Sequence, residues 1–189
     1  VLPFDNMSGD AEQEYFADGI TEDLITDLSK VSGLLVIARN SVFTYKGQAV
    51  NVPDVCRELG VRWALEGSVR KAGNRVRVTA QLIDGETGGH LWADRFDRDL
   101  DDIFAVQDEV TAEIISALKV KLSADEQVQV SHRSTQHVEA YDTMLRARDL
   151  IISGTESSMV QARILIQRGL EDDPGFAGAM AGMAFTFIG

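Results

Sequence analysis

Closely spaced acidic side chains are the most obvious candidates for chemistry in this sequence of 189 residues. They are Asp94, Asp97, Asp99, Asp101 and Asp102. A calcium-binding EF-hand loop would need a glycine at its sixth position and a glutamate at its twelfth, and no glycine follows here. We interpret the run as a solvated loop that leads into a helix, where acidic residues favour the positive end of the helix dipole. The sequence predicts no metal site here.

Three other features also lack the pattern that a reaction would need. His132 and His137 have neither the HExxH spacing nor a third ligand for zinc. The glycine-rich stretch 84–89 is not followed by Lys-Ser/Thr, so it is typical of a turn rather than of a phosphate-binding loop. Cys56 lies at helical spacing with apolar neighbours, which favours a small buried hydrophobe. We therefore expect no catalytic residue, no metal and no cofactor in this segment.

A surface that could bind a partner is indicated by basic and aromatic residues in neighbouring strands. The residues of this candidate interaction face are Arg70, Arg75, Arg77, Trp92 and Phe96. Exposed aromatic side chains beside arginines are typical of docking surfaces. The alternative is that the helix beginning near Ile103 covers Trp92 and Phe96, because its own apolar stripe must be buried.

A second candidate surface lies near the carboxyl end of the chain. Met180, Met183 and Phe187 recur at helical spacing, and we call them the repeat-stacking face. Large apolar side chains seldom stay uncovered on a monomer. Cover could come from the amino-terminal domain or from a second copy of the chain, or the segment could be disordered. We favour a second copy, which would make the chain a homodimer.

The elements that would position these residues centre on residues 59–100. Alternation of apolar and polar residues on both sides of Gly73-Asn74 predicts a hairpin that pairs Arg70 with Arg75. A further turn at 84–89 predicts a third strand, with Leu91 and Ala93 on the buried face. The buried face of the first two strands is then Trp63, Leu65, Gly67, Val69, Val76, Val78, Ala80 and Leu82.

The rest of the first 122 residues alternates between strands and helices. Residues 1–4 and the apolar run 34–38 are predicted as buried strands, the second one covered on both faces. Amphipathic helices are predicted before and after the second strand, and a long helix begins near Ile103. The expected order is β-α-β-α-β-β-β-α, which is a mixed α/β sheet.

A change of composition then separates two domains. Residues 1–122 are predicted as the α/β domain, polar residues 123–137 as a linker, and residues 138–189 as an all-α segment. In the last segment, small residues at helical spacing precede Pro174. Small residues at helix crossings and a proline at the turn are typical of tetratricopeptide repeats, here imperfect and truncated.

Composition limits the classes of protein that fit. The chain is 44% hydrophobic and 25% charged, which is ordinary for a globular protein. Its formal net charge of −12 disfavours a nucleic-acid partner, because phosphates would be repelled. No run is apolar enough to predict a transmembrane helix. The chain starts at Val1 in what reads as the inside of a strand, so we expect it to be part of a longer protein.

Two long stretches resemble a known family. They read VLPFDNMSGDAEQEYFADGITEDLITDLSKVSGLLVIARNS and ELGVRWALEGSVRKAGNRVRVTAQLIDGETGGHLWADRFDRDLDDIFAVQDEV. Both are similar to the TolB-amino-terminal-like domain, which occurs in bacterial proteins with tetratricopeptide repeats. The resemblance covers residues 1 to about 122. It implies that the parent carries an adenylate/guanylate cyclase domain or, alternatively, a CadC-like winged-helix DNA-binding domain.

The resemblance also implies a location and a role. It implies the periplasmic portion of an inner-membrane protein, attached to the membrane only through a helix upstream of Val1. We expect a non-catalytic sensor or interaction module that binds a protein or peptide and no nucleic acid. A purely structural oligomerisation module is the other alternative, and the sequence does not identify the ligand.

Overall fold

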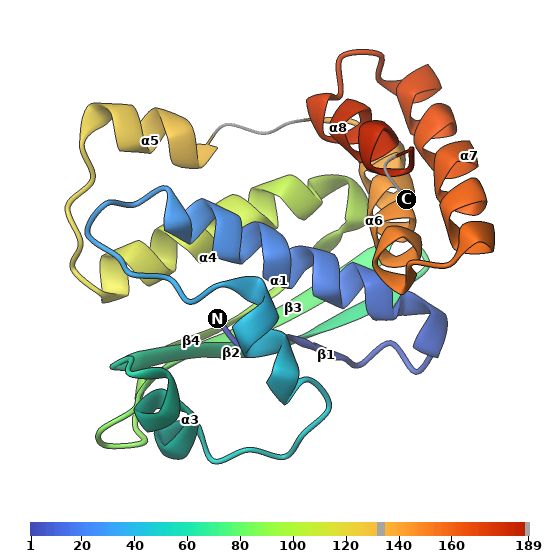
Figure 1. Cartoon of the computed structure of the whole chain (residues 1–189). Coiled ribbons are helices and arrows are strands. Elements are labelled where there is room, and N and C mark those ends of the chain that lie inside the picture. The colour runs from blue at the N-terminus through green and yellow to red at the C-terminus, as the bar shows by residue number, and fades with distance from the viewer. Residues whose placement is uncertain (132–134, 188–189) are drawn as a thin grey trace. The chain divides into compact units, whose positions relative to one another are not determined.

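The computed structural model describes residues 1–131 and 135–187, which form two compact units, Val1–Ser131 and His132–Gly189. Figure 1 shows the elements of both units along the chain. The first unit contains β1 (Asp5–Asn6), η1 (Ala11–Gln13), α1 (Glu14–Ser29), α2 (Arg39–Val42), η2 (Phe43–Tyr45), α3 (Val52–Leu59), β2 (Trp63–Ala72), β3 (Arg75–Asp84), β4 (His90–Asp99), η3 (Leu100–Asp102), α4 (Ile103–Ala117) and α5 (Ala124–Ser131).

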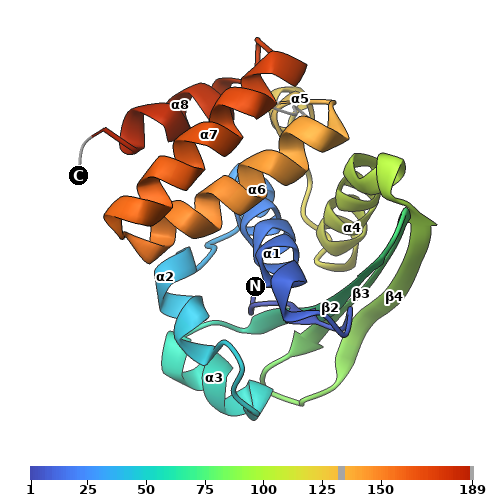
Figure 2. The same cartoon turned by 90° about the vertical axis from the view of Figure 1, so that its right-hand side faces the viewer.

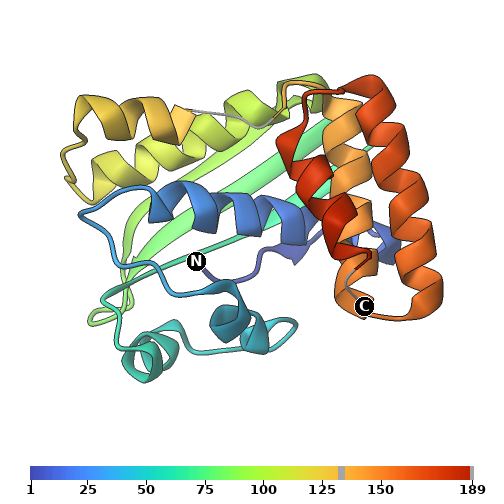
Figure 3. The same ribbon diagram turned by 45° about the horizontal axis from the view of Figure 1, so that its top comes forward.

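The first unit is built on a mixed sheet of four strands in the order β1-β2-β3-β4. β1 pairs parallel with β2, and the other neighbours are antiparallel. Helices α1 and α4 run over one face of this sheet, as Figure 2 and Figure 3 show from two directions. The predicted mixed α/β class is confirmed.

Apolar residues on one face of the hairpin explain why helices cover that face. Leu65, Val69, Val76, Val78, Ala80 and Leu82 are all buried, as the alternation predicted. The predicted pairing of Arg70 with Arg75 is wrong, however, because Arg70 lies opposite Arg77. The hairpin closes through the two residues Gly73 and Asn74, and this shift of two positions leaves every side chain on its predicted face.

The third strand runs antiparallel as predicted, but its two faces are exchanged relative to the prediction. Trp92 pairs with Leu82, but His90 pairs with Ile83, so the register shifts at this point. One extra residue in a bulge exchanges the two faces of the strand that follows it. Leu91 is consequently 48% exposed, whereas Phe96 is buried at 5% exposure. The predicted burial of Leu91 and Ala93 is therefore wrong.

Three smaller expectations about this unit also fail. Residues 34–38 form no strand, and Leu35 is 87% exposed. The first strand is Asp5–Asn6 and not residues 1–4. Residues 1–4 still run beside β2, since the Leu2 N–H donates to the Leu65 carbonyl at 2.7 Å. Trp63 is 36% exposed because it lies at the end of β2, beside a cavity described below.

Phe4 joins the first segment to both layers of the unit. Its ring is fully buried against Gly67 of β2, where a Cβ atom would lie 2.6 Å from the ring and 2.3 Å from the Thr79 carbonyl oxygen. Its N–H donates to the Thr21 hydroxyl of α1 at 3.0 Å. Strand β2 and helix α1 are therefore held by the same residue.

A helix occupies the first part of the stretch that was predicted as a linker. Helix α5 belongs to the first unit, and Glu126 fixes it there. One carboxylate oxygen of Glu126 accepts from the Ser32 N–H at 2.8 Å, and the other accepts from the Ser123 N–H at 2.7 Å. Hydrogen bonds from the Ser123 backbone, then from Ser32, lower the pKa of Glu126 to about 2.

The second unit is the all-α segment that the sequence predicted. It contains α6 (Val138–Ser153), α7 (Glu156–Asp172) and α8 (Ala177–Phe185). Ala140, Met144, Ala162, Ile166 and Phe176 form its core. Small residues permit this close packing, since a Cβ atom on Gly182 would lie 2.7 Å from Met144 Cε.

We predict that Gly67→Ala destabilises the first unit by about 1–3 kcal/mol, because the added methyl group overpacks the site that Phe4 fills. Thermal or denaturant unfolding measures the loss. Arg75→Ala is the control, since exposed ion pairs add little to stability. Equal unfolding midpoints for the two variants would contradict the packing described here.

We also predict a pH-dependent contribution from Glu126. Its pKa is lowered from 4.5 to about 2 in the folded chain, so its stabilising effect is complete above the unfolded value and disappears as the pH falls towards about 2. Glu126→Gln should lower the melting temperature near neutral pH, and the difference from the native chain should vanish at the acid end. Glu113→Gln, at an exposed site on α4, should show no such convergence.

Candidate functional site

The main candidate site is an apolar cavity of about 240 Å³ in the first unit. The start of β2, helix α3 and the unpaired segment 34–38 form much of its wall. Only two of the lining side chains are titratable, Cys56 and Arg62. A concave, mostly aliphatic wall with few polar groups is typical of a binding site.

Arg62 lies at this cavity and is held loosely. Its guanidinium carbon is 5.2 Å from the centre of the Trp63 ring, and two of its nitrogens lie 3.4 Å from Asp84 Oδ2. Asp84 is held separately, because its Oδ1 accepts from the N–H groups of Glu86 and Thr87. Those backbone hydrogen bonds are the main reason why the pKa of Asp84 is lowered. Arg62 contributes less to this shift, and its side chain remains 58% exposed.

Cys56 is buried in the fold, as predicted, and its thiol also lines the cavity. It packs tightly against the turn after β3, where a Cβ atom on Gly85 would lie 2.7 Å from Cys56 Sγ. Burial raises the pKa of the Cys56 thiol. A buried thiol with a raised pKa is a poor nucleophile.

The sequence could not reveal this cavity because its wall comes from segments far apart along the chain. The run 34–38 has the composition of a buried strand, and that pattern concealed its role as a cavity wall.

The candidate interaction face is not a single surface. Arg70, Arg75 and Arg77 are exposed on the outer face of the sheet. Trp92 and Phe96 pair with Leu82 and Val78, so they lie on the opposite, helix-covered face. On that face Phe96 is buried, whereas Trp92 is only partly buried.

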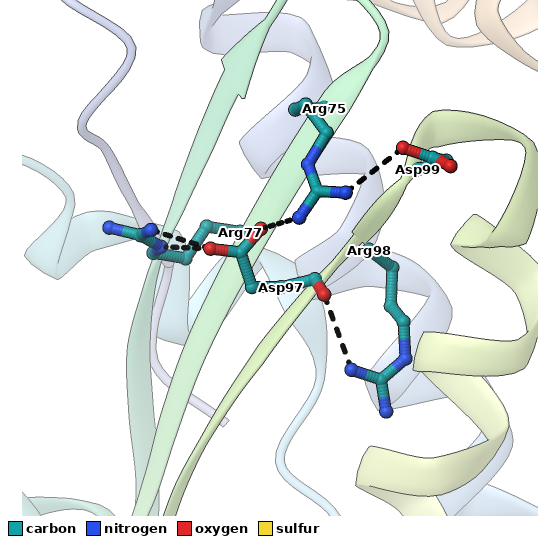
Figure 4. A network of polar contacts seen from close by, with 5 residues as sticks. All are labelled: Arg75, Arg77, Asp97, Arg98 and Asp99. Atoms are coloured by element: carbon teal, nitrogen blue, oxygen red, sulfur yellow. Dashed lines mark hydrogen bonds and ion pairs between the residues drawn. The ribbon is translucent and has the colours of Figure 1, made fainter.

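The arginines on the outer face form a charged network with β4, drawn in Figure 4. Asp97 accepts from Arg75 at 2.6 Å and from Nε of Arg77 at 3.0 Å, and Arg75 also reaches Asp99 at 3.1 Å. Hydrogen bonds from Arg77, then from Arg75, lower the pKa of Asp97. Exposed pairs of this kind set the orientation of side chains more than they stabilise the fold.

The repeat-stacking face is open within the second unit. Met180 is 48% exposed and Phe187 is 67% exposed, whereas Met183 packs partly against the core. The Arg163 guanidinium lies 4.3 Å from the centre of the Phe187 ring. Two of the three residues are therefore exposed and one is partly buried, and their stacking on a further copy stays a prediction.

Residues 1–131 and 135–187 contain no cluster of three potential metal ligands. Likewise, none of the helices built from these residues is long and apolar enough to cross a bilayer. His132, part of the histidine pair considered above, lies outside the described residues.

Comparison with known proteins gives one close sequence relative. No family model matches the chain. The chain is 61% identical over 188 residues to a protein of Rhizobium meliloti (strain 1021) named "Putative adenylate cyclase 3". The match covers 100% of this chain but only 32% of that protein, so the chain spans about a third of its relative.

Solved structures with a similar arrangement are more distant. TolB from Acinetobacter baumannii superposes with a TM-score of 0.45 and 19% identity, over 62% of this chain and 27% of that one. The lipoprotein GNA1162 from Neisseria meningitidis gives a TM-score of 0.45 and 19% identity, over 65% of this chain and 96% of that one.

We predict that the Cys56 thiol reacts at least about tenfold more slowly with a thiol reagent in the native chain than in denaturant, because it is buried and its pKa is raised. Absorbance of the released chromophore follows the reaction. Cys56→Ser gives the background rate. Native and denatured rates that agree would show that the thiol is open to solvent.

Proposed function

We propose that this chain is a non-catalytic sensor and protein-interaction module of a membrane-anchored bacterial signalling protein whose output domain is an adenylate or guanylate cyclase. The cavity beside β2 carries the proposal. Its wall can bind an apolar group, and its two titratable side chains are a buried thiol and an arginine. A site of this composition favours binding over turnover.

The relationship to the Rhizobium protein supports the cyclase part of the proposal. Identity of 61% extends along the whole chain, yet the chain corresponds to 32% of that protein. The remaining two-thirds leave room for a catalytic domain outside the region that matches. The nucleotide chemistry is therefore assigned to the parent protein and not to this segment.

The partner is a protein or peptide, and the module lies in the periplasm with its anchor upstream. Two features of the chain support a protein partner. The repeat-stacking face exposes large apolar side chains, and stacked helix pairs commonly present such surfaces to extended partners. The net charge of −12 works against binding to nucleic acid.

Cyclase assays on two proteins test this proposal. The chain of 189 residues and the full-length protein that contains it are each incubated with ATP or GTP and Mn²⁺, and cyclic nucleotide is measured. We expect product from the full-length protein and none above buffer from the chain alone. Turnover by the chain would overturn its non-catalytic role. An inactive full-length protein would overturn the assignment of a cyclase output.

A further inference from the structure

Strand β4 is an open edge of the sheet. It is the last strand in the order β1-β2-β3-β4 and pairs only with β3 among the described residues. It has ten residues, His90–Asp99, and Figure 2 shows it along the outer margin of the sheet. A long edge strand presents a row of backbone N–H and C=O groups to which another strand can bind.

Two hydrogen bonds show which backbone groups face outwards. The Arg95 N–H donates to Asp94 Oδ1 at 2.7 Å, and the Asp97 carbonyl accepts from the Arg98 guanidinium at 3.2 Å. The Leu100 N–H donates to the Asn74 carbonyl at 2.8 Å, so even-numbered positions of β4 face β3 and these two groups lie outside the ladder. Because the ladder groups alternate along an antiparallel strand, the backbone groups of Ala93, Arg95, Asp97 and Asp99 face the free edge.

This parity limits how two copies of β4 could pair about a two-fold axis. Outward residues of one copy must lie opposite outward residues of the other, so the axis passes through a residue and not between two residues. At the centre of the charged run that residue is 95, 96 or 97. An axis at Arg95 places two arginines opposite each other, and an axis at Asp97 places two aspartates opposite each other. Like charges that are directly opposite are destabilising.

The axis at Phe96 gives a different result. Asp94 then lies opposite Arg98 of the second copy, and Arg95 lies opposite Asp97 of the second copy. Symmetry repeats both pairs, so all four charged positions around Phe96 meet the opposite sign. The sequence Asp-Arg-Phe-Asp-Arg is therefore charge-complementary to itself when it is read in the antiparallel direction.

Pairing would exchange contacts that these groups already make at exposed positions within the chain, since Asp94 accepts from the Arg95 N–H and Arg98 donates to the Asp97 carbonyl. The side chain of Arg95 makes no hydrogen bond or ion pair with any residue that the structure describes, and it is exposed. Arg98 is 3.3 Å from Glu109, but both side chains are close to half exposed, and such pairs are weak. Asp97 is already oriented by Arg75 and Arg77, which hold its carboxylate on the outer face beside the edge.

Charges on an edge strand also serve to prevent aggregation, and that is the simpler explanation. To prevent aggregation, an edge strand needs only charged side chains that repel one another or that resist burial. It does not need opposite signs placed symmetrically about one residue, in one of the registers that the backbone permits. The order of positive and negative charges along β4 therefore favours pairing with a specific partner over a general protection against aggregation.

We propose that β4 pairs antiparallel with β4 of a second copy of this chain, about a two-fold axis at Phe96, so that two four-stranded sheets become one continuous sheet. The interface is separate from the repeat-stacking face and from the cavity. It stands whether or not the parent protein is a cyclase.

A charge swap across the proposed axis tests both the interface and its register. Sedimentation equilibrium of the full chain should show a dimer. Asp94→Arg alone, or Arg98→Asp alone, creates two like-charge pairs and should raise the dimer Kd by about ten- to hundredfold. The double variant Asp94→Arg/Arg98→Asp restores opposite charges in this register, so it should return the Kd to within about threefold of the native value.

Two further variants test the specificity of the interface and the contribution of the backbone. Arg70→Glu reverses an exposed charge on the interior strand β2 and should leave the dimer unchanged. Ala93→Pro removes an outward N–H without removing a ladder bond to β3, so it should weaken the dimer while circular dichroism shows a folded chain. A native chain that is monomeric at the highest attainable concentration would overturn the proposal. So would a dimer that persists in Asp94→Arg, or folded variants in which the double swap fails to restore association.

Discussion

The contact between Phe4 and Gly67 is the constraint on which the first unit depends. A phenylalanine ring fills the space over β2 that any side chain at position 67 would need. The same residue donates its N–H to Thr21, so the position of the sheet relative to α1 follows from it. The first segment can then lie parallel to β2, and only the other side of β2 is left for the hairpin. The strand order, with β4 at the open edge, is a consequence of this arrangement.

Local alternation predicted the parts of the fold that depend on neighbouring residues. The hairpin of β2 and β3 kept its predicted faces even though its turn is shorter by two residues, because a shift of two preserves side-chain direction. A shift of one does not, and the bulge opposite Leu82 and Ile83 reversed the prediction for the third strand. That single extra residue determines which face of the sheet Trp92 lies on, and the pattern of apolar residues does not reveal it.

The candidate sites were harder to predict for a related reason. Residues 34–38 have the composition of a buried strand, yet the structure leaves Leu35 exposed and uses the segment as one wall of the cavity. Composition reports the apolar character of a segment, whereas its partner is set by tertiary packing. The single cysteine was correctly predicted as buried, but nothing local to it indicated a cavity. The charged side chains of β4 were read as a solvated loop and helix start, and their symmetry about Phe96 acquires meaning only once β4 is known to be an edge.

The net charge of the chain clarifies what those side chains contribute. Two copies with a formal net charge of −12 each repel one another at long range, so general electrostatic attraction cannot bring them together. Backbone hydrogen bonds along the free edge are short-range and independent of sequence, and alone they would allow several registers. The opposite charges around Phe96 act over the same short range, and each mismatched register replaces an attraction with a repulsion. In this arrangement the backbone supplies the affinity, and the ion pairs select one register among those that the backbone allows.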